Sequence, residues 1–238
     1  MAALDHHDWV AKYIDGRDEE THFEHRGRVV FEHPQLSKPI TLLQEAISKE
    51  KASGTAEDIE VFPATRLWPG GHRLATFLCE NPDVVAGKRV LELGSGVGIV
   101  GLTAASLGAA SVTVTDAHVV LLNENAALNE LPNVCVRKLV WGDTKLEEEE
   151  PELILGSDII YNQGPEVMAA LASSLNYFAE KRATVGKATT MYLAYELRTD
   201  WESLKAFKAE ARAAGFQITN VPTPDWSDDQ MLLELTRS

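Results

Sequence analysis

Three glycines that alternate with other residues form the segment of this chain best suited to holding a ligand. The sequence Gly-Ser-Gly-Val-Gly at 94–98 lies between an apolar stretch at 89–94 and a pattern of helical spacing at about 97–108. Glycine has no β-carbon, so the backbone of such a turn can lie close to a bound molecule. The first amides of the following helix have no partner within the helix and can donate to that molecule. We therefore predict a small-molecule site at this strand-to-helix turn.

Two ligand classes fit the glycine turn. Residues 96–101 match the Gly-x-Gly-x-x-Gly pattern of dinucleotide sites, and Asp116 follows about 20 residues later, as that pattern requires. Against this, Gly94 already ends the strand and Gly101 falls inside the expected helix. Glu92 would repel a pyrophosphate but suits a ligand with a positive charge. S-adenosylmethionine carries such charges on its sulfonium and amino groups, so Glu92 favours it, while the glycine turn alone leaves both ligands open.

Asp116 stands at the end of the second expected strand, 111–116. An acidic residue at that place accepts hydrogen bonds from ribose hydroxyls in nucleotide-binding folds. The alternative is that Asp116 caps the helix expected over about 118–129, since aspartate is a preferred N-cap residue. The two roles are compatible.

From residue 72 onward the apolar pattern predicts a regular series of elements. Strands are expected at 89–94, 111–116, 134–140, 153–160, 190–195, 215–221 and 231–235, and helices at about 72–80, 97–108, 118–129, 165–181 and 201–214. Alternating strands and helices are typical of a parallel sheet. The last two strands are joined without a helix, so they should pair antiparallel. The sequence thus predicts an α/β fold: a Rossmann-like, seven-stranded, mostly parallel sheet with helices on both faces and a C-terminal antiparallel hairpin.

The N-terminal part of the chain has a different character. Residues 1–65 are polar and irregular, apart from short apolar stretches at 29–31 and 40–43 that predict a hairpin. Residues 49–60 have no apolar period and indicate an exposed loop. We therefore expect an N-terminal extension over 1–65 and a domain over 66–238.

Composition narrows the classes of partner. The formal charge of −14 disfavours binding to nucleic acid or to anionic lipid, and it suits a basic protein surface, although such a charge also serves solubility. No apolar run of 18 residues occurs, so no membrane span is expected. Cys79 and Cys135 form no Cys-x-x-Cys pair, and the histidines form no His-Glu-x-x-His pattern, so we expect no metal. We expect a monomer in a reducing compartment, the cytoplasm or the nucleus.

Five short motifs, in their order and spacing, resemble one known family. They are Leu-Trp-Pro-Gly-Gly at 67–71, Val-Leu-Glu-Leu-Gly-Ser-Gly-Val-Gly at 90–98, Thr-Asp at 115–116, Val-Trp-Gly at 140–142 and Gly-Ser-Asp-Ile-Ile-Tyr at 156–161. Together they resemble the family-16 seven-strand S-adenosylmethionine-dependent methyltransferases, most of which are protein-lysine methyltransferases. The resemblance extends from about residue 66 to the C-terminus and implies the class I methyltransferase fold.

The resemblance also implies the residues of the cofactor site. They are Trp68, Glu92, Gly94, Ser95, Gly96, Gly98, Asp116, Ala117, Trp141 and Ser157. Trp141 would lie near the adenine, because an indole offers a broad apolar face and one donor. Either tryptophan could instead fill the core. Ser157 stands where the family often has alanine, which is a departure from its pattern.

Asp158 and Tyr161 are the residues that the resemblance places where the methyl group meets its acceptor. A carboxylate there could orient a lysine amine, which attacks only when neutral although its ordinary pKa is about 10.4. A surface aspartate and a half-buried tyrosine are the simpler alternative. Glu196 and Arg198, at the end of a later strand, could touch the substrate or form a surface pair.

These observations together predict an S-adenosylmethionine-dependent N-methyltransferase that acts on lysine in a protein. Three alternatives stay open: a small-molecule acceptor, a protein histidine, or a catalytically silent module that only binds the cofactor. An oxidoreductase with a dinucleotide fits less well, because it leaves Glu92 and the motif at 156–161 without a role.

Overall fold

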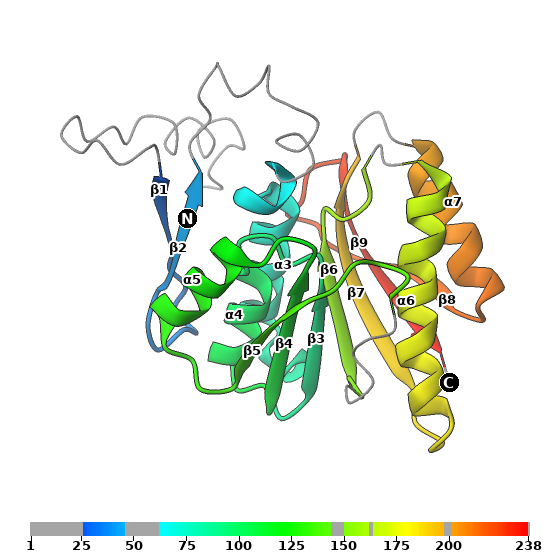
Figure 1. The fold of residues 1–238 in the computed structure, drawn as a ribbon, viewed down its shortest axis with the longest axis horizontal. Helices are drawn as coiled ribbons and strands as arrows, with labels where there is room; N and C mark the ends of the chain where they lie inside the picture. Colours follow the sequence, from blue (N-terminus) through cyan, green and yellow to red (C-terminus); the bar gives the residue numbers. More distant parts are fainter. Residues whose placement is uncertain (1–25, 46–61, 144–149, 162–163, 198–200, 238) are drawn as a thin grey trace.

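The computed structural model describes residues 26–45, 62–143, 150–161, 164–197 and 201–237. Within these residues the chain forms a seven-stranded sheet and a separate two-stranded sheet (Figure 1). The loop expected at 49–60 lies outside the described residues, as does Arg198.

The elements follow one another in the predicted order. The strands are β1 (Arg26–Phe31), β2 (Ile40–Glu45), β3 (Arg89–Leu93), β4 (Ser111–Asp116), β5 (Val134–Lys138), β6 (Leu153–Ser157), β7 (Thr189–Glu196), β8 (Gln217–Val221) and β9 (Gln230–Arg237). The helices are α3 (Pro69–Glu80), α4 (Ile99–Ser106), α5 (Val120–Asn129), α6 (Pro165–Ala183) and α7 (Trp201–Ala213), with short 3-10 turns η2 (Phe62–Thr65) and η3 (Pro82–Val84).

The larger sheet has the strand order β5-β4-β3-β6-β7-β9-β8. Strands β3 to β7 pair in parallel, whereas β9 runs antiparallel to both β7 and β8. The predicted fold class, including the closing antiparallel hairpin, is confirmed. The order reverses between β3 and β6, because the chain first builds outward to β4 and β5 and then returns. Open α/β sheets bind ligands at such a switch point, beyond the carboxyl ends of the strands.

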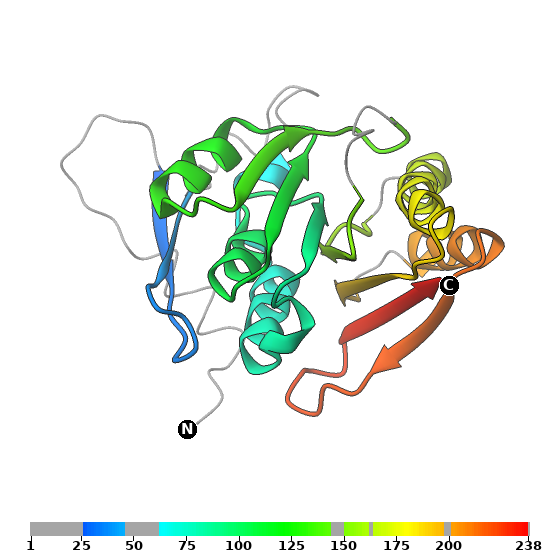
Figure 2. The same ribbon diagram turned by 90° about the horizontal axis from the view of Figure 1, so that it is seen from below.

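Each central strand is buried on both faces by alternate side chains. Val90 and Val112 pack in the apolar cluster that includes α3, α4 and α5. Leu91, Leu93 and Ile154 pack in the cluster that includes α6 and α7. Figure 2 shows these two groups of helices on opposite sides of the sheet. The mostly apolar central strands are therefore covered by helices on both faces, as is typical of parallel strands. This packing fixes the position of each strand end, and therefore the position of the ligand site.

Among the boundaries that differ from the sequence prediction, three have clear local reasons. Helix α3 begins at Pro69 rather than at 72, because proline is favoured at the first helical position. Helix α4 begins only at Ile99, since Gly98 has a φ of 93° and stands before the first turn. Strand β6 ends at Ser157 instead of 160, because Asp158 has a φ of 50° and turns the chain out of the sheet.

The predicted N-terminal hairpin is present as β1 and β2, which pair antiparallel with Phe31 opposite Ile40. Its buried side chains, which include Phe31, Ile40 and Leu42, belong to the same apolar cluster as α4 and α5. Phe31 also lies edge-on to the ring of His72 in α3, with 5.3 Å between centroids. The hairpin therefore packs on the main sheet's helices and has no core of its own.

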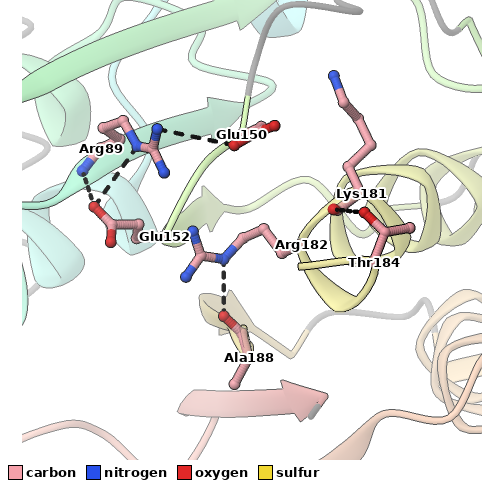
Figure 3. A network of polar contacts seen from close by, with 7 residues as sticks. All are labelled: Arg89, Glu150, Glu152, Lys181, Arg182, Thr184 and Ala188. Carbon is pink, nitrogen blue, oxygen red and sulfur yellow. Dashed lines mark hydrogen bonds and ion pairs between the residues drawn. The ribbon is translucent and has the colours of Figure 1, made fainter. Parts of the chain in front are cut away.

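The amino ends of the strands carry a polar network (Figure 3). Arg89, at the start of β3, lies with Nε 3.7 Å from the carboxylate of Glu152 and Nη1 4.0 Å from that of Glu150. On α6, Arg182 donates from Nε to the carbonyl of Ala188 over 2.8 Å. In the described part of the chain, no helix is long and apolar enough to span a membrane, and no three metal-binding side chains gather in one place.

Candidate active site

A cavity of about 490 Å³ lies beyond the carboxyl ends of β3, β4 and β6, at the switch point of the sheet. Ten of the twelve residues that the sequence singled out line it: Trp68, Gly94, Ser95, Gly96, Asp116, Ala117, Trp141, Ser157, Asp158 and Tyr161. The other two, Glu92 and Gly98, do not reach its wall. The residues come from distant parts of the chain, and the strand ends bring them together.

The glycine turn forms the floor of this cavity. Gly94 has a φ of 64°, and a β-carbon there would lie 2.6 Å from Cγ2 of Ile159 and 3.2 Å from Cζ2 of Trp141. The turn is held by the amide of Ser95, which donates to the carbonyl of Thr115 over 2.8 Å. Only glycine combines that backbone angle with that space. Gly94 therefore lets the turn, Trp141 and Ile159 share one tightly packed wall.

Asp116 ties the glycine turn to the end of β4. Its Oδ2 accepts from the amide of Gly96 over 2.9 Å, and its Oδ1 accepts from the amide of His118 over 3.0 Å. Burial raises the pKa of Asp116, and these amide bonds act in the opposite direction. Helix α5 has Val119 at its N-cap, so Asp116 closes a turn ahead of the helix rather than capping it. Each carboxylate oxygen keeps a further lone pair for a ligand hydroxyl.

Glu92 points into the protein and not into the cavity. Its side chain is 1% exposed, and Oε2 accepts from the amide of Gly101, in the first turn of α4, over 2.9 Å. Burial raises its pKa to about 8, Asp116 adds to this, and hydrogen bonds from Ser95 and Gly101 oppose it. At neutral pH the group is therefore mostly protonated. The sequence predicts a charged Glu92 beside the ligand, whereas in the structure the Glu92 carboxyl group binds the first turn of α4.

Asp158 joins three elements at the cavity's edge. Its Oδ2 accepts from the amide of Gly70 over 2.6 Å and its Oδ1 from the amide of Glu196 over 3.3 Å. The side chain is 7% exposed. A β-carbon on Gly70 would lie 2.6 Å from the carboxylate, so the bond requires glycine there. Asp158 thus holds the start of α3 and the end of β7 against β6.

The aromatic side chains of the site are all partly buried. Trp68 precedes α3, and the guanidinium carbon of Arg66 lies 5.9 Å from the centre of its ring. Trp141 follows β5 and faces the glycine turn, while Tyr161 follows β6. None of the three is enclosed in the core. Each therefore presents ring surface to the cavity, as a purine or an acceptor side chain requires.

Several lining residues were not among those that the sequence assigned to the site. They include Arg66, Leu67, His118, Leu139, Ile159 and Glu166. His118 and Ile159 could have been found as neighbours of Asp116 and Asp158 along the chain. Glu166 lies in the first turn of α6, and nothing in its local sequence indicates that this turn lines the cavity.

The strand order and the site at the switch point define a class I methyltransferase fold. The chain superposes on the 16S rRNA methyltransferase RsmC of T. thermophilus, solved with AdoMet (S-adenosylmethionine) and guanosine, with a TM-score of 0.55 and 17% identity, over 87% of this chain and 50% of that one. It also superposes on the methyltransferase domain of bacterial CtHen1, with a TM-score of 0.52 and 12% identity, over 69% and 97% of the two chains.

Residues 50–209 match the sequence model of a family described as lysine methyltransferases. The chain belongs to this S-adenosylmethionine-dependent family. It is 30% identical to the protein-lysine N-methyltransferase EFM3 of Chaetomium thermophilum, over 82% of this chain and 59% of that one. It is 36% identical to the protein N-lysine methyltransferase METTL21A of Danio rerio, over 49% and 56%. It is 29% identical to the histone-arginine methyltransferase METTL23 of Xenopus laevis, over 70% of each chain. The chain spans about half the length of the EFM3 and METTL21A relatives.

Proposed function

We propose that this protein transfers the methyl group of S-adenosylmethionine to the side-chain nitrogen of a lysine in another protein. The observation that carries the proposal is the gathering of Trp68, Asp116, Trp141 and Tyr161 around one cavity at the switch point. Membership of the lysine methyltransferase family supports the choice of acceptor. Because EFM3 and METTL21A are named as lysine methyltransferases, we extend that acceptor to this chain.

The cavity fits S-adenosylmethionine in volume and in chemistry. A volume of about 490 Å³ lies within the range of pockets for ligands of this size. We assign Asp116 to the ribose hydroxyls and Trp141 to the adenine. The described residues that line the cavity include three carboxylates, Asp116, Asp158 and Glu166, and one guanidinium, Arg66. The walls therefore carry more acidic than basic groups and suit a cationic ligand.

When bound, S-adenosylmethionine supplies a methyl group on a positively charged sulfur, which a neutral amine displaces. The amine nitrogen would bond to the methyl carbon as the carbon–sulfur bond broke, S-adenosylhomocysteine would leave as a neutral thioether, and the proton of the methylated amine would pass to solvent. The protein's part is to align the amine and to exclude water. We assign this part to Tyr161, with its ring and hydroxyl at the cavity, and to the edge that Asp158 holds in place.

We propose that the partner presents a basic surface, in keeping with the formal charge of −14. Cys79 and Cys135 are both free thiols in the structure, and Cys79 is buried. Free thiols support a reducing compartment, so we place the enzyme in the cytoplasm or the nucleus.

Two measurements, made one after the other, test this function. Titration calorimetry should give a binding constant for S-adenosylmethionine and no heat with NAD, and the reverse result refutes the cofactor. The protein is then incubated with methyl-labelled S-adenosylmethionine and a cell extract, and labelled proteins are digested and mapped by mass spectrometry. Label on lysine supports the proposal.

Label on arginine, as the name of the METTL23 relative would suggest, refutes the lysine assignment but keeps the methyltransferase. Label on histidine or only on small molecules leads to the same conclusion.

Tyr161→Phe tests the role of the Tyr161 hydroxyl. We expect slower transfer with an unchanged binding constant for S-adenosylmethionine, because the ring remains and only the hydroxyl is lost.

A further inference from the structure

Hydrogen bonds link the hairpin β1–β2 to two segments that line the cavity, one directly and one through a residue of α5. Strand β2 pairs with β1 along one edge only, and its other edge faces α5. An unpaired strand edge leaves backbone amides and carbonyls that need partners. The side chains that satisfy this edge determine how firmly the hairpin is attached to the site.

Two asparagines of α5, four residues apart, supply those partners. Asn125 accepts from the amide of Leu43 over 2.7 Å and donates to its carbonyl over 3.0 Å. Asn129 accepts from the amide of Thr41 over 2.9 Å and donates to its carbonyl over 2.7 Å. Because residues four apart lie on one helix face, the pair acts like a neighbouring strand and fixes the register of β2 on α5.

The two asparagines differ in their third hydrogen bond. Nδ2 of Asn125 also donates to the carbonyl of Val97 over 2.9 Å, and Val97 belongs to the glycine turn and lines the cavity. Nδ2 of Asn129 instead donates to the carbonyl of Asn125 over 2.7 Å, within α5. Asn125 has no exposed surface. The same side chain therefore connects β2 to the glycine turn.

A second connection reaches another segment of the cavity wall. The side-chain oxygen of Gln44 in β2 accepts from the amide of Leu67 over 3.1 Å. Leu67 lines the cavity and directly precedes Trp68. Strand β2 thus contacts the segment that carries Trp68 directly, and it is linked to the glycine turn through Asn125.

We propose that the hairpin β1–β2 is a brace for the S-adenosylmethionine cavity, with Asn125 and Gln44 as positioning residues. Neither side chain touches the ligand; each fixes a backbone segment that does. The proposal rests on the proposed cofactor, and it gives residues 26–45 a part in cofactor binding rather than in solubility or substrate choice.

Matched variants of the full chain test the brace. Asn125→Ala and Asn129→Ala each remove three hydrogen bonds, two of them to β2, but only Asn125→Ala frees the glycine turn. Loss of a bond worth about 1 kcal/mol corresponds to about a fivefold change in a binding constant. Calorimetry with S-adenosylmethionine should therefore show a dissociation constant about fivefold higher or more for Asn125→Ala, and one within about twofold of wild type for Asn129→Ala.

Gln44 supplies the second pair of variants, which remains decisive if Asn125→Ala does not fold. Gln44→Glu keeps an oxygen that accepts from Leu67, whereas Gln44→Leu does not. We expect the leucine variant to bind S-adenosylmethionine more weakly and the glutamate variant to bind as wild type. Circular dichroism at the assay temperature confirms that each variant is folded. Equal affinities within either pair of folded variants overturn the brace, whereas a wild-type protein that binds no S-adenosylmethionine overturns the proposed function instead.

Discussion

The two ends of the parallel strands are built from different interactions. At the carboxyl ends, Asp158 is buried, Asp116 is partly buried, and both accept hydrogen bonds from backbone amides of other segments. At the amino ends, the carboxylate of Glu152 pairs with the guanidinium of Arg89 and accepts from its amide (Figure 3), but the side chains of Arg89 and Glu152 are 44% and 35% exposed. A buried carboxylate bonded to amides fixes the backbone itself, whereas an exposed ion pair contributes little. The carboxyl ends should therefore tolerate change poorly and the amino ends well.

The largest contrast is expected between two glycines on either side of β3. Gly94→Ala forces a β-carbon to within 2.6 Å of Ile159 at a φ of 64°, whereas Gly87→Ala meets nothing within 4 Å at a similar φ of 71°. Both variants bear backbone strain of about 1–3 kcal/mol. Only Gly94→Ala should also lose S-adenosylmethionine binding, by about a hundredfold or more, since overpacking displaces the cavity wall.

Calorimetry on the two glycine variants, with thermal unfolding as the measure of strain, separates the two effects. If Gly87→Ala weakens binding as much as Gly94→Ala, backbone strain alone controls the site and the difference between the two ends is not real.

A smaller contrast is expected when a carboxylate is exchanged for an amide at each end. In Asp116→Asn, one of the two backbone donors at Gly96 and His118 faces an NH2 group instead of an oxygen. Loss of a charge-assisted bond of about 1.5–3 kcal/mol predicts a dissociation constant for S-adenosylmethionine at least about tenfold higher. Glu152→Gln is the matched change at the amino end and should leave that constant unchanged. Comparable losses in both variants would contradict the assignment of Asp116.

How far the sequence could predict this molecule depends on the range of the interaction. Strand and helix order follows from apolar periodicity along short segments, and the glycine turn is a local signal, so both were predicted. The direction of the Glu92 side chain could not be predicted, because its neighbours Leu91 and Leu93 can be buried on either face of the sheet. The partner that decides it, the amide of Gly101, lies on the next helix. The bond from Gly70 to Asp158 joins residues 88 positions apart, and neither residue's surroundings in the chain point to it.

Glu92 predicts a pH effect on stability at the carboxyl ends. Its pKa rises from an ordinary 4.5 to about 8 because of burial, so between these values the folded chain holds a proton that the unfolded chain releases. The free energy of unfolding should therefore fall as pH rises from about 4.5 to about 8, by at most about 1.4 kcal/mol per pH unit from this group.

Urea unfolding of the wild type and of Glu92→Gln at pH 5, 7 and 9 measures this dependence. Glutamine keeps an oxygen for the amide of Gly101 and has no proton to lose, so its curve should be flatter and its advantage over wild type should grow with pH. Parallel curves for the two proteins would mean that Glu92 ionises normally, and that the helix α4 beneath the cavity rests on a charged carboxylate.

The smallest effect is expected for Glu152→Gln at the amino ends. The pair with Arg89 spans 3.7 Å between partly exposed groups, and glutamine still offers an oxygen to the Arg89 amide, which donates to Glu152 over 3.1 Å. An exposed pair is typically worth under about 1 kcal/mol and is screened by salt. Urea unfolding at low and high ionic strength should show a loss below that value which shrinks further in salt. A loss of about 2 kcal/mol or more that persists in salt would mean that this network stabilises the amino ends of the strands. Both ends of the strands would then contribute to the stability of the site.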